Sequence, residues 1–377
     1  MQPLSTTLPR KIMASSVAEE TPRVSFGPAG PKVRPLDEIA RSDRGYDEEL
    51  AYLMSVVSAW AYSDENVLAS KLRHYGLTGA RVHRVAVQNN ALLVVTTAYL
   101  IQSASGKTAI LAFRGTDPGD FIMVLTDAQV MLREFQKGRV HSGFYLSVEV
   151  VWDEIHTALT AAMQGKAVTI KDGRTHEVDL PNRLETLYVT GHSLGGAMAV
   201  LAAARLFADG YEDLRPKIKG IYTFGQPMVG DTDFATACEQ DFQGRLHRHV
   251  FQHDVVPHLP PRSGLKYAHS GGEFRASKND VRWKYTDDAS GPAPLTAGLI
   301  SVLLNAVESR VSPVDFLPGY SIDDHMPLEY LEACRRALDP STAAIRRETG
   351  IVARVEAAGA RVVSGFHRRV GAILGTG

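Results

Sequence analysis

The sequence predicts an α/β fold in which a central, mainly parallel β-sheet is covered by helices on both faces. Three observations lead to this class. A short apolar strand at residues 187–190 is followed at once by an Ala-rich helical stretch at residues 195–207. Two further strands, at residues 218–224 and 246–251, flank another helical stretch. Strand–helix–strand alternation favours parallel strands that are buried on both faces of the sheet.

Size and composition fit one large core. The chain has 377 residues, of which 44% are hydrophobic, an ordinary fraction for a globular protein. The formal net charge is −1, so no long-range field favours a nucleic-acid partner. Cys238 and Cys334 are far apart in the sequence. We expect two buried free thiols, because disulfide frameworks belong to small cysteine-rich domains.

The elements before the central strands follow from local patterns. Apolar residues recur at helical spacing over residues 50–61, which predicts an amphipathic helix. Two β-rich runs, residues 92–101 and 108–114, are joined by a short polar turn and predict a hairpin. An apolar stripe over residues 148–159 predicts another helix. Residues 167–178 contain an Asp-Gly turn and predict a surface hairpin.

The composition divides the chain into three parts. Residues 1–40 are rich in Pro, Ser and Thr and predict a flexible leader. Residues 41–340 hold the predicted α/β domain, and residues 341–377 predict a basic amphipathic helix. The leader lacks the apolar region of a secretory signal, and no stretch reaches the ~20 apolar residues that span a bilayer. We therefore expect a cytoplasmic protein, or one exported by a route that is independent of a signal peptide.

The C-terminal helix has two faces. Its arginines recur every seven residues, and apolar side chains form a second stripe. Such a helix is typical of peripheral binding to a lipid surface. Docking on the domain or pairing with a second chain fits the same pattern, so the oligomeric state stays open. The arginines are Arg347, Arg354, Arg361 and Arg368.

A candidate nucleophile lies between the first central strand and its helix. Residues 191–195 read Gly-His-Ser-Leu-Gly, the G-x-S-x-G pattern of the nucleophile elbow in α/β-hydrolases. The two glycines lack a Cβ, so strand and helix can approach closely around a strained serine. A helix-capping serine is the alternative interpretation of this pattern. The strand–turn–helix context favours Ser193 as the nucleophile.

An acid and a base are expected further along the chain, in the order Ser…Asp/Glu…His. Asp254 follows the predicted strand 246–251, at the carboxyl end where α/β sites assemble. The alternative for Asp254 is a loop-capping role. Spacing retains His269 and His325 as candidate bases without deciding between them. The histidines after Asp254 are His258, His269, His325 and His367.

Five sequence blocks together identify a resemblance. In this order, they make the chain similar to the class 3 lipases, the fungal triacylglycerol lipase-like family, over about residues 50–334. The blocks are Ala-Phe-Arg-Gly-Thr (112–116), Val-His-Ser-Gly-Phe (140–144), Val-Thr-Gly-His-Ser-Leu-Gly-Gly-Ala (189–197), Thr-Phe-Gly-Gln-Pro-Met-Val-Gly (223–230) and His-Asp-Val-Val-Pro-His-Leu-Pro (253–260).

The resemblance implies which histidine is the base. The block at residues 324–330 resembles the one that carries the catalytic base in the family. The block at residues 267–273 resembles one that follows the catalytic Asp and is not itself catalytic. His325 is therefore the expected base, and His269 is expected to be structural. The segment between the two blocks is longer than in compact members of the family.

The resemblance also implies a mechanism. Ser193 would form an acyl-enzyme, with Asp254 stabilising the imidazolium of His325. The expected oxyanion donors are the backbone N–H groups of Leu194 and Thr116, with the Thr116 hydroxyl as a third. His141 is expected to be structural, and His192 to pack beside the elbow.

The function expected from the resemblance is a serine carboxylic-ester hydrolase, a lipase that cleaves acylglycerol esters. A phospholipase A1 or a general esterase would use the same residues. A protein of a different class, a non-catalytic lipid- or protein-binding domain, would commonly lack the Ser or the His. No cofactor or metal is expected. Apolar segments at residues 121–125, 130–132 and 295–307 are candidate lids over the site, or ordinary core helices.

Overall fold

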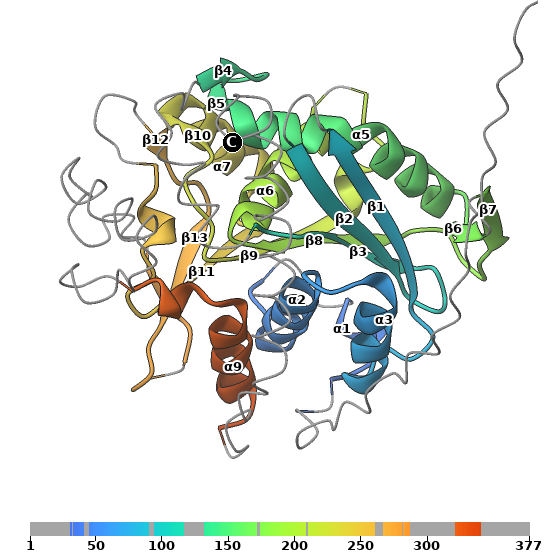
Figure 1. The fold of residues 1–377 in the computed structure, drawn as a ribbon, viewed down its shortest axis with the longest axis horizontal. Helices are drawn as coiled ribbons and strands as arrows, with labels where there is room; N and C mark the ends of the chain where they lie inside the picture. Colours follow the sequence, from blue (N-terminus) through green and yellow to red (C-terminus); the bar gives the residue numbers. More distant parts are fainter. Residues whose placement is uncertain are drawn as a thin grey trace, which may run out of the picture.

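A central eight-stranded sheet organises the chain in the computed structural model (Figure 1). The structure describes residues 31, 33–40, 45–89, 94–116, 132–171, 174–208, 210–260, 267–280, 282–286 and 321–340. The strand order is β1-β2-β3-β8-β9-β11-β13-β14. The run from β3 to β13 is parallel, whereas β1, β2 and β14 add antiparallel pairs at the edges. The predicted fold class is thus confirmed. The bounds are β1 Arg81–Asn89, β2 Val94–Gln102, β3 Thr108–Phe113, β8 Thr186–His192, β9 Ile218–Phe224, β11 Leu246–Phe251, β13 Gly272–Ala276 and β14 Lys284–Thr286.

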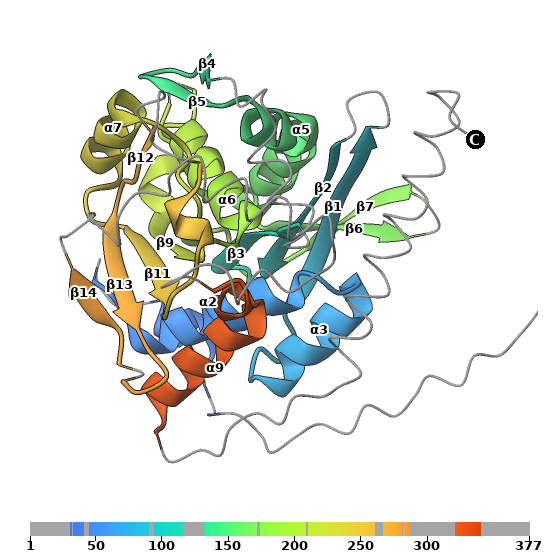
Figure 2. The same ribbon diagram turned by 60° about the vertical axis from the view of Figure 1, so that its left-hand side comes forward.

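Helices cover both faces of this sheet, and each face has its own hydrophobic core. Figures 1 and 2 show α5, α6 and α7 on one face and α2, α3 and α9 on the other, where Figure 1 also shows α1. The first core includes Trp152 and Leu201, and the second includes Leu53 and Leu331. The bounds are α1 Leu36–Ile39, α2 Glu48–Trp60, α3 Glu65–His74, α5 Ser142–Met163, α6 Leu194–Leu206, α7 Thr232–Phe242 and α9 Pro327–Leu338.

The central strand and helix explain why the site lies where it does. Every residue of β8 is buried, as expected for a strand covered on both faces. The following α6 is rich in alanine and nearly all of its residues are buried, because small side chains let a helix pack closely against the sheet. The turn between the two is therefore fixed from both sides.

Most of the predicted elements are present. The helix expected at residues 50–61 is α2, whose first turn is capped by Asp47 accepting from the backbone N–H of Leu50 at 2.9 Å. The first predicted hairpin corresponds to β2 and β3. The second corresponds to β6 (Lys166–Lys171) and β7 (Arg174–Asp179). The helix expected at residues 148–159 lies within α5.

A second, smaller sheet lies beside the carboxyl ends of the central strands, where Figure 1 shows it above α6. Its strand order is β12-β10-β5-β4. Leu132 of the predicted lid segment 130–132 belongs to β4, and the segments 121–125 and 295–307 lie outside the described residues. The bounds are β4 Leu132–Glu134, β5 Arg139–His141, β10 Gly230–Asp231 and β12 Tyr267–Ala268.

The end of the predicted leader is part of the packed domain. Leu36 and Ile39 of α1 are buried in the second core, and Asp37 accepts a hydrogen bond from the Ser105 hydroxyl at 2.6 Å. Apolar side chains therefore extend the domain to before residue 41. The predicted C-terminal helix at 341–377 lies outside the described residues. Within the described part of the chain, no helix is long and apolar enough to cross a membrane. Both cysteines are free and buried, as expected.

Two histidines of β11 are buried in an aromatic cluster on the second face. His247 and His249 pack against Tyr222 and Phe274. Burial lowers the pKa of His247 from 6.5 to about 4 and that of His249 to about 3. Unfolding exposes both rings to water, where they bind protons at a higher pH. Each histidine therefore favours the unfolded state as the pH falls below about 6.5.

We expect His247→Phe to flatten the acid dependence of stability. In the wild type, each such histidine removes about 1.4 kcal/mol from the free energy of unfolding per pH unit between its unfolded and folded pKa. The phenylalanine variant should therefore gain on the wild type as the pH falls from 6.5 toward 4, by about 3 kcal/mol at the acid end. Urea unfolding at a series of pH values across this window measures the difference. His74→Phe, at an exposed position, is the control and should run parallel to the wild type.

Candidate active site

Ser193 occupies a strained turn between β8 and α6. Its φ is 59° and its ψ is −130°, a conformation that costs a non-glycine residue about 1–3 kcal/mol. A Cβ on Gly191 would lie 2.2 Å from the carbonyl oxygen of Gly195, and one on Gly195 would lie 2.3 Å from that of Phe113. Both positions therefore require glycine. The structure has the geometry that the G-x-S-x-G pattern predicts.

The environment of Ser193 suits a nucleophile. The side chain is fully buried, and among the described residues its Oγ has no hydrogen-bond partner. Its backbone N–H donates to the carbonyl of Phe224 at 2.9 Å, which ties the turn to β9. Ser193 also lies at the N-terminus of α6, where the helix dipole favours negative charge. An alkoxide developing here is stabilised.

Asp254 and His325 form a fully buried pair. The Nδ1 of His325 lies 2.7 Å from Oδ2 of Asp254, and both side chains have 0% exposure. Asp254 comes three residues after β11, and its Oδ1 accepts from the backbone N–H of Val256 at 2.8 Å. His325 ends a short 3-10 helix at Asp323–His325. The structure thus brings the predicted acid and base together across 71 residues of sequence.

Tyr330 also contacts this pair, a role that no sequence motif predicted. It lies on α9, and its hydroxyl donates to Oδ2 of Asp254 at 2.5 Å. Burial and the adjacent carboxylate raise the pKa of Tyr330 well above its usual value, so the hydroxyl keeps its proton. The backbone N–H of Phe251 donates to the same hydroxyl at 3.2 Å. The only signal in the sequence is a tyrosine shortly after the predicted base.

The turn that carries His325 is anchored to the end of β11. Ser321 and Asp254 form a β-bridge, and the backbone N–H of Ser321 donates to the carbonyl of His253 at 2.7 Å. Asp324 is buried, and its carboxylate accepts from Lys278 at 2.7 Å and from the backbone N–H of His253 at 3.3 Å. These contacts fix the position of the base relative to the acid.

Gly225 leaves room for the Asp–His pair. It follows β9 with a φ of +60°, in the conformation that favours glycine. A Cβ at this position would lie 2.7 Å from Nδ1 of His325 and 2.8 Å from Oδ2 of Asp254. The glycine in the Thr-Phe-Gly-Gln-Pro block therefore lets the chain pass directly against the hydrogen bond between acid and base.

The predicted oxyanion donors lie on two segments that contact each other. Leu194 is the first residue of α6, and Thr116 follows β3. A Cβ on Gly115 would lie 2.6 Å from the carbonyl oxygen of His192, and one on Gly195 would lie 3.0 Å from the backbone nitrogen of Gly115. The loop after β3 therefore rests on the elbow next to Ser193. The role of Thr116 and Leu194 as donors stays a prediction.

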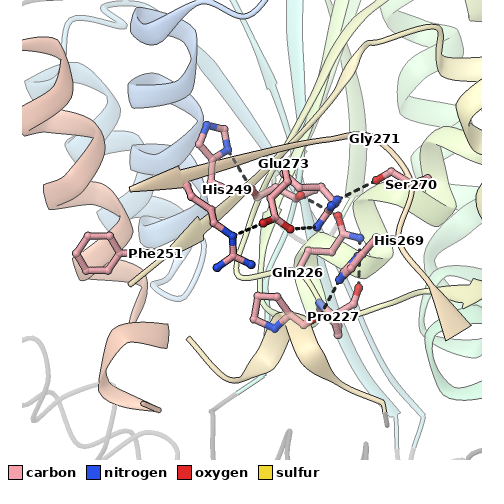
Figure 3. A network of polar contacts seen from close by, with 12 residues as sticks. Gln226, Pro227, His249, Phe251, His269, Ser270, Gly271 and Glu273 are labelled. Carbon is pink, nitrogen blue, oxygen red and sulfur yellow. Dashed lines mark hydrogen bonds and ion pairs between the residues drawn. The ribbon is translucent and has the colours of Figure 1, made fainter. Parts of the chain in front are cut away.

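His269 belongs to the polar network of Figure 3. Its Nε2 donates to the carbonyl of Pro257 at 2.7 Å. The neighbouring carbonyl of Ser270 accepts from the buried Arg248 at 2.9 Å, and Arg248 also pairs with Glu273 at 3.3 Å. His269 thus supports the loop that follows Asp254. His325 is the histidine that the structure places on Asp254.

Two further polar residues have structural partners. Nδ1 of His141 accepts from the backbone N–H of Gly143 at 3.1 Å, and burial lowers the pKa of His141 to about 4. Asp231 caps α7 by accepting from the backbone N–H of Phe234 at 3.0 Å and pairs with Arg139 at 3.0 Å. Among the residues that the structure describes, no group of three or more His, Cys, Asp or Glu side chains is arranged to hold a metal ion.

The comparisons with known proteins agree with the resemblance. Residues 110–264 match the family model described as Lipase (class 3). The chain is 34% identical to a lipase of Rhizopus niveus over 193 residues, which cover 48% of this chain and 42% of that protein. It is 32% identical to a lipase of Rhizomucor miehei over 192 residues, covering 50% and 47%. Toxin TseL of Vibrio cholerae is 36% identical over 169 residues, 43% of this chain and 22% of the toxin.

Solved structures extend the likeness of the fold. The propeptide complex of Rhizomucor miehei lipase has a TM-score of 0.52 at 23% identity, covering 78% of this chain and 81% of that one. The lipase of Rhizopus microsporus var. chinensis has a TM-score of 0.51 at 21% identity, covering 80% and 96%. The fold is that of the α/β-hydrolases. Within it, residues 110–264 carry the class 3 lipase pattern, so the resemblance is confirmed. In sequence, the matches with the lipases of Rhizopus niveus and Rhizomucor miehei span less than half the length of each of those proteins.

We expect Gly225→Ala to destabilise the domain more than the strain of its backbone alone explains. Gly244 also has a positive φ, +76°, but a Cβ there would meet nothing within 4 Å. Gly244→Ala should cost about 1 kcal/mol of unfolding free energy. Gly225→Ala should cost a further ~1–3 kcal/mol, because the methyl group presses on the Asp–His pair. Urea unfolding of the two variants measures this difference, and equal losses would contradict the packing described.

Proposed function

We propose that the chain is a serine carboxylic-ester hydrolase that cleaves acylglycerol esters through an acyl-enzyme. One observation carries the proposal: a strained, buried serine at a helix N-terminus lies at the same edge of the sheet as a fully buried Asp–His pair. The His192 ring, next to Ser193 in the chain, is centred 4.6 Å from the His325 ring. The arrangement supports nucleophilic catalysis by Ser193 with His325 as base and Asp254 as acid.

The proton positions follow from the contacts of His325. Its Nδ1 faces a carboxylate, which only accepts, so Nδ1 carries the proton and Nε2 presents a lone pair. His325 Nε2 takes the Ser193 proton as Oγ attacks the ester carbonyl, and Asp254 stabilises the imidazolium. The oxyanion accepts from the N–H groups of Leu194 and Thr116. His325 then protonates the departing alcohol, and water, deprotonated by the same nitrogen, releases the fatty acid.

The substrate class rests on the relatives. The Rhizopus and Rhizomucor relatives are named lipases, and Rhizomucor miehei lipase is described as a triacylglyceride lipase. A phospholipase A1 or a general esterase would use the same triad. We propose acylglycerols as the preferred substrates, with contact at a lipid surface. Hydrolysis of triacylglycerol, phosphatidylcholine and short esters by the same preparation separates the three activities.

We expect Ser193→Ala and His325→Ala to abolish hydrolysis of p-nitrophenyl esters. Loss of a triad serine or histidine lowers kcat by as much as ~10⁶-fold. A series of acyl lengths measured on the wild type gives the chain-length preference. His269→Gln is the matched control, because glutamine can still donate to the Pro257 carbonyl and His269 lies outside the proposed triad. Collapse of His269→Gln with an active His325→Ala would reverse the assignment, and a wild type inert on every ester would refute the function.

Tyr330→Phe tests the third hydrogen bond to the acid. The variant keeps the ring in its buried place and removes the donor to Oδ2 of Asp254. A hydrogen bond to a charged group contributes about 1.5–3 kcal/mol. We expect part of this loss to appear as a kcat that is lower by roughly tenfold. The KM for a short ester should stay near the wild-type value. An unchanged kcat would mean that the hydroxyl only fills space.

A further inference from the structure

A polar chain behind the elbow ends on the backbone of His325. The hydroxyl of Tyr62, just after α2, lies 2.8 Å from Nδ1 of His192. The Nε2 of His192 lies 2.6 Å from the carbonyl oxygen of His325. His192 itself is the last residue of β8 and precedes Ser193. The chain therefore connects the residue beside the nucleophile to the residue that acts as base.

The chemistry of the partners fixes every proton in this chain. The His325 carbonyl can only accept, so Nε2 of His192 carries the proton and donates it. Nδ1 of a neutral His192 is then an acceptor, and the Tyr62 hydroxyl donates to it. The ring has 1% exposure, and burial together with the neighbouring His325 keeps the pKa of His192 well below its usual range. A neutral ring here places no positive charge against the imidazolium that forms on His325.

The same chain touches the segment that carries Thr116. A Cβ on Gly115 would lie 2.1 Å from the Tyr62 hydroxyl and 2.6 Å from the His192 carbonyl oxygen. The glycine thus lets the loop after β3 close over the contact between Tyr62 and His192. Three parts of the proposed machinery meet at this point: the elbow, the base and the loop with a predicted oxyanion donor.

We propose that His192 and Tyr62 are positioning residues, which hold the backbone of His325 so that its ring faces Ser193. The inference rests on the proposed function and adds two residues to it. Tyr330 and Val256 orient Asp254, and Asp254 orients the His325 ring. His192 restrains His325 through its backbone carbonyl, whereas Asp254 restrains it through its ring. Misplacement of a catalytic group by about 1 Å can cost ~10²-fold in rate.

Variants of the two residues separate positioning from filling of the core. His192→Leu removes the donor to the His325 carbonyl. His192→Gln keeps a donor at about the place of Nε2, and Tyr62→Phe removes only the hydroxyl. The control is Tyr211→Phe, because the Tyr211 hydroxyl also bonds a buried ring nitrogen, Nε1 of Trp152 at 2.8 Å, away from the site.

The first measurement is the kcat and KM for a short p-nitrophenyl ester. We expect kcat to fall ~10–100-fold in His192→Leu and roughly tenfold in Tyr62→Phe, with KM within about twofold. His192→Gln should recover most of the loss, and Tyr211→Phe should match the wild type. Equal activity of the Gln and Leu variants, or a loss in Tyr211→Phe as large as in Tyr62→Phe, would overturn the proposal.

The second measurement does not depend on catalysis. The Nδ1 proton between His325 and Asp254 is buried and should give a low-field proton NMR resonance in the wild type. The resonance should shift or broaden in Tyr62→Phe, and be lost in His192→Leu, but stay in His192→Gln and Tyr211→Phe.

If the wild type hydrolyses no ester yet shows this pattern, the proposed function fails and the positioning stands. A resonance identical in all variants, or absent from the wild type, refutes the positioning. If His192→Leu does not fold, the kcat values and the low-field resonances of His192→Gln and Tyr62→Phe test the proposal.

Discussion

The rest of the structure depends on the burial of one polar group, the carboxylate of Asp254. A charge removed from water is costly unless hydrogen bonds replace its hydration. Here the replacements come from three places in the chain: the backbone of Val256, the ring of His325 and the hydroxyl of Tyr330. Val256 lies two residues from Asp254, whereas His325 and Tyr330 lie 71 and 76 residues from it. The end of β11, the turn at Asp323–His325 and helix α9 must therefore converge on one point, so the Asp–His pair is a constraint on the fold.

One pair of helices positions both tyrosines of the site. Helices α2 and α9 pack together on the second face of the sheet, in the core that contains Leu53, Val57 and Leu331. Tyr330 lies on α9, and Tyr62 follows the end of α2. The first reaches the acid and the second reaches His192, which bonds the backbone of the base. The contact between the two helices therefore helps to place both hydroxyls, and the rings of His192 and Tyr330 also meet edge to face, with 5.7 Å between their centroids.

Features that depend on residues close together in sequence could be predicted, whereas contacts between distant residues could not. The elbow at Ser193 is local, since strand, glycines and helix occur within a few residues, and Asp254 is marked by the end of a strand. Spacing did not separate His325 from His269, because a partner 71 residues away is chosen by packing; the resemblance supplied that choice. Strand β1 was not predicted. One of its buried positions is the polar His83, which interrupts the apolar alternation that marks a strand. Tyr62 and Tyr330 were missed because their contacts with the site are all distant in sequence.

The position of His325 is fixed by contacts made within a few residues of it. The chain that follows β14 returns to the site at Ser321, whose bridge to Asp254 and bond to the His253 carbonyl set the register of the turn. Asp324 adds an ion pair with Lys278, and His192 holds the His325 carbonyl. Each of these contacts joins a residue of the turn at 321–325 to a residue at or near the end of a strand of the central sheet. The position of His325 relative to Asp254 is therefore determined by the contacts of residues 321–325 themselves.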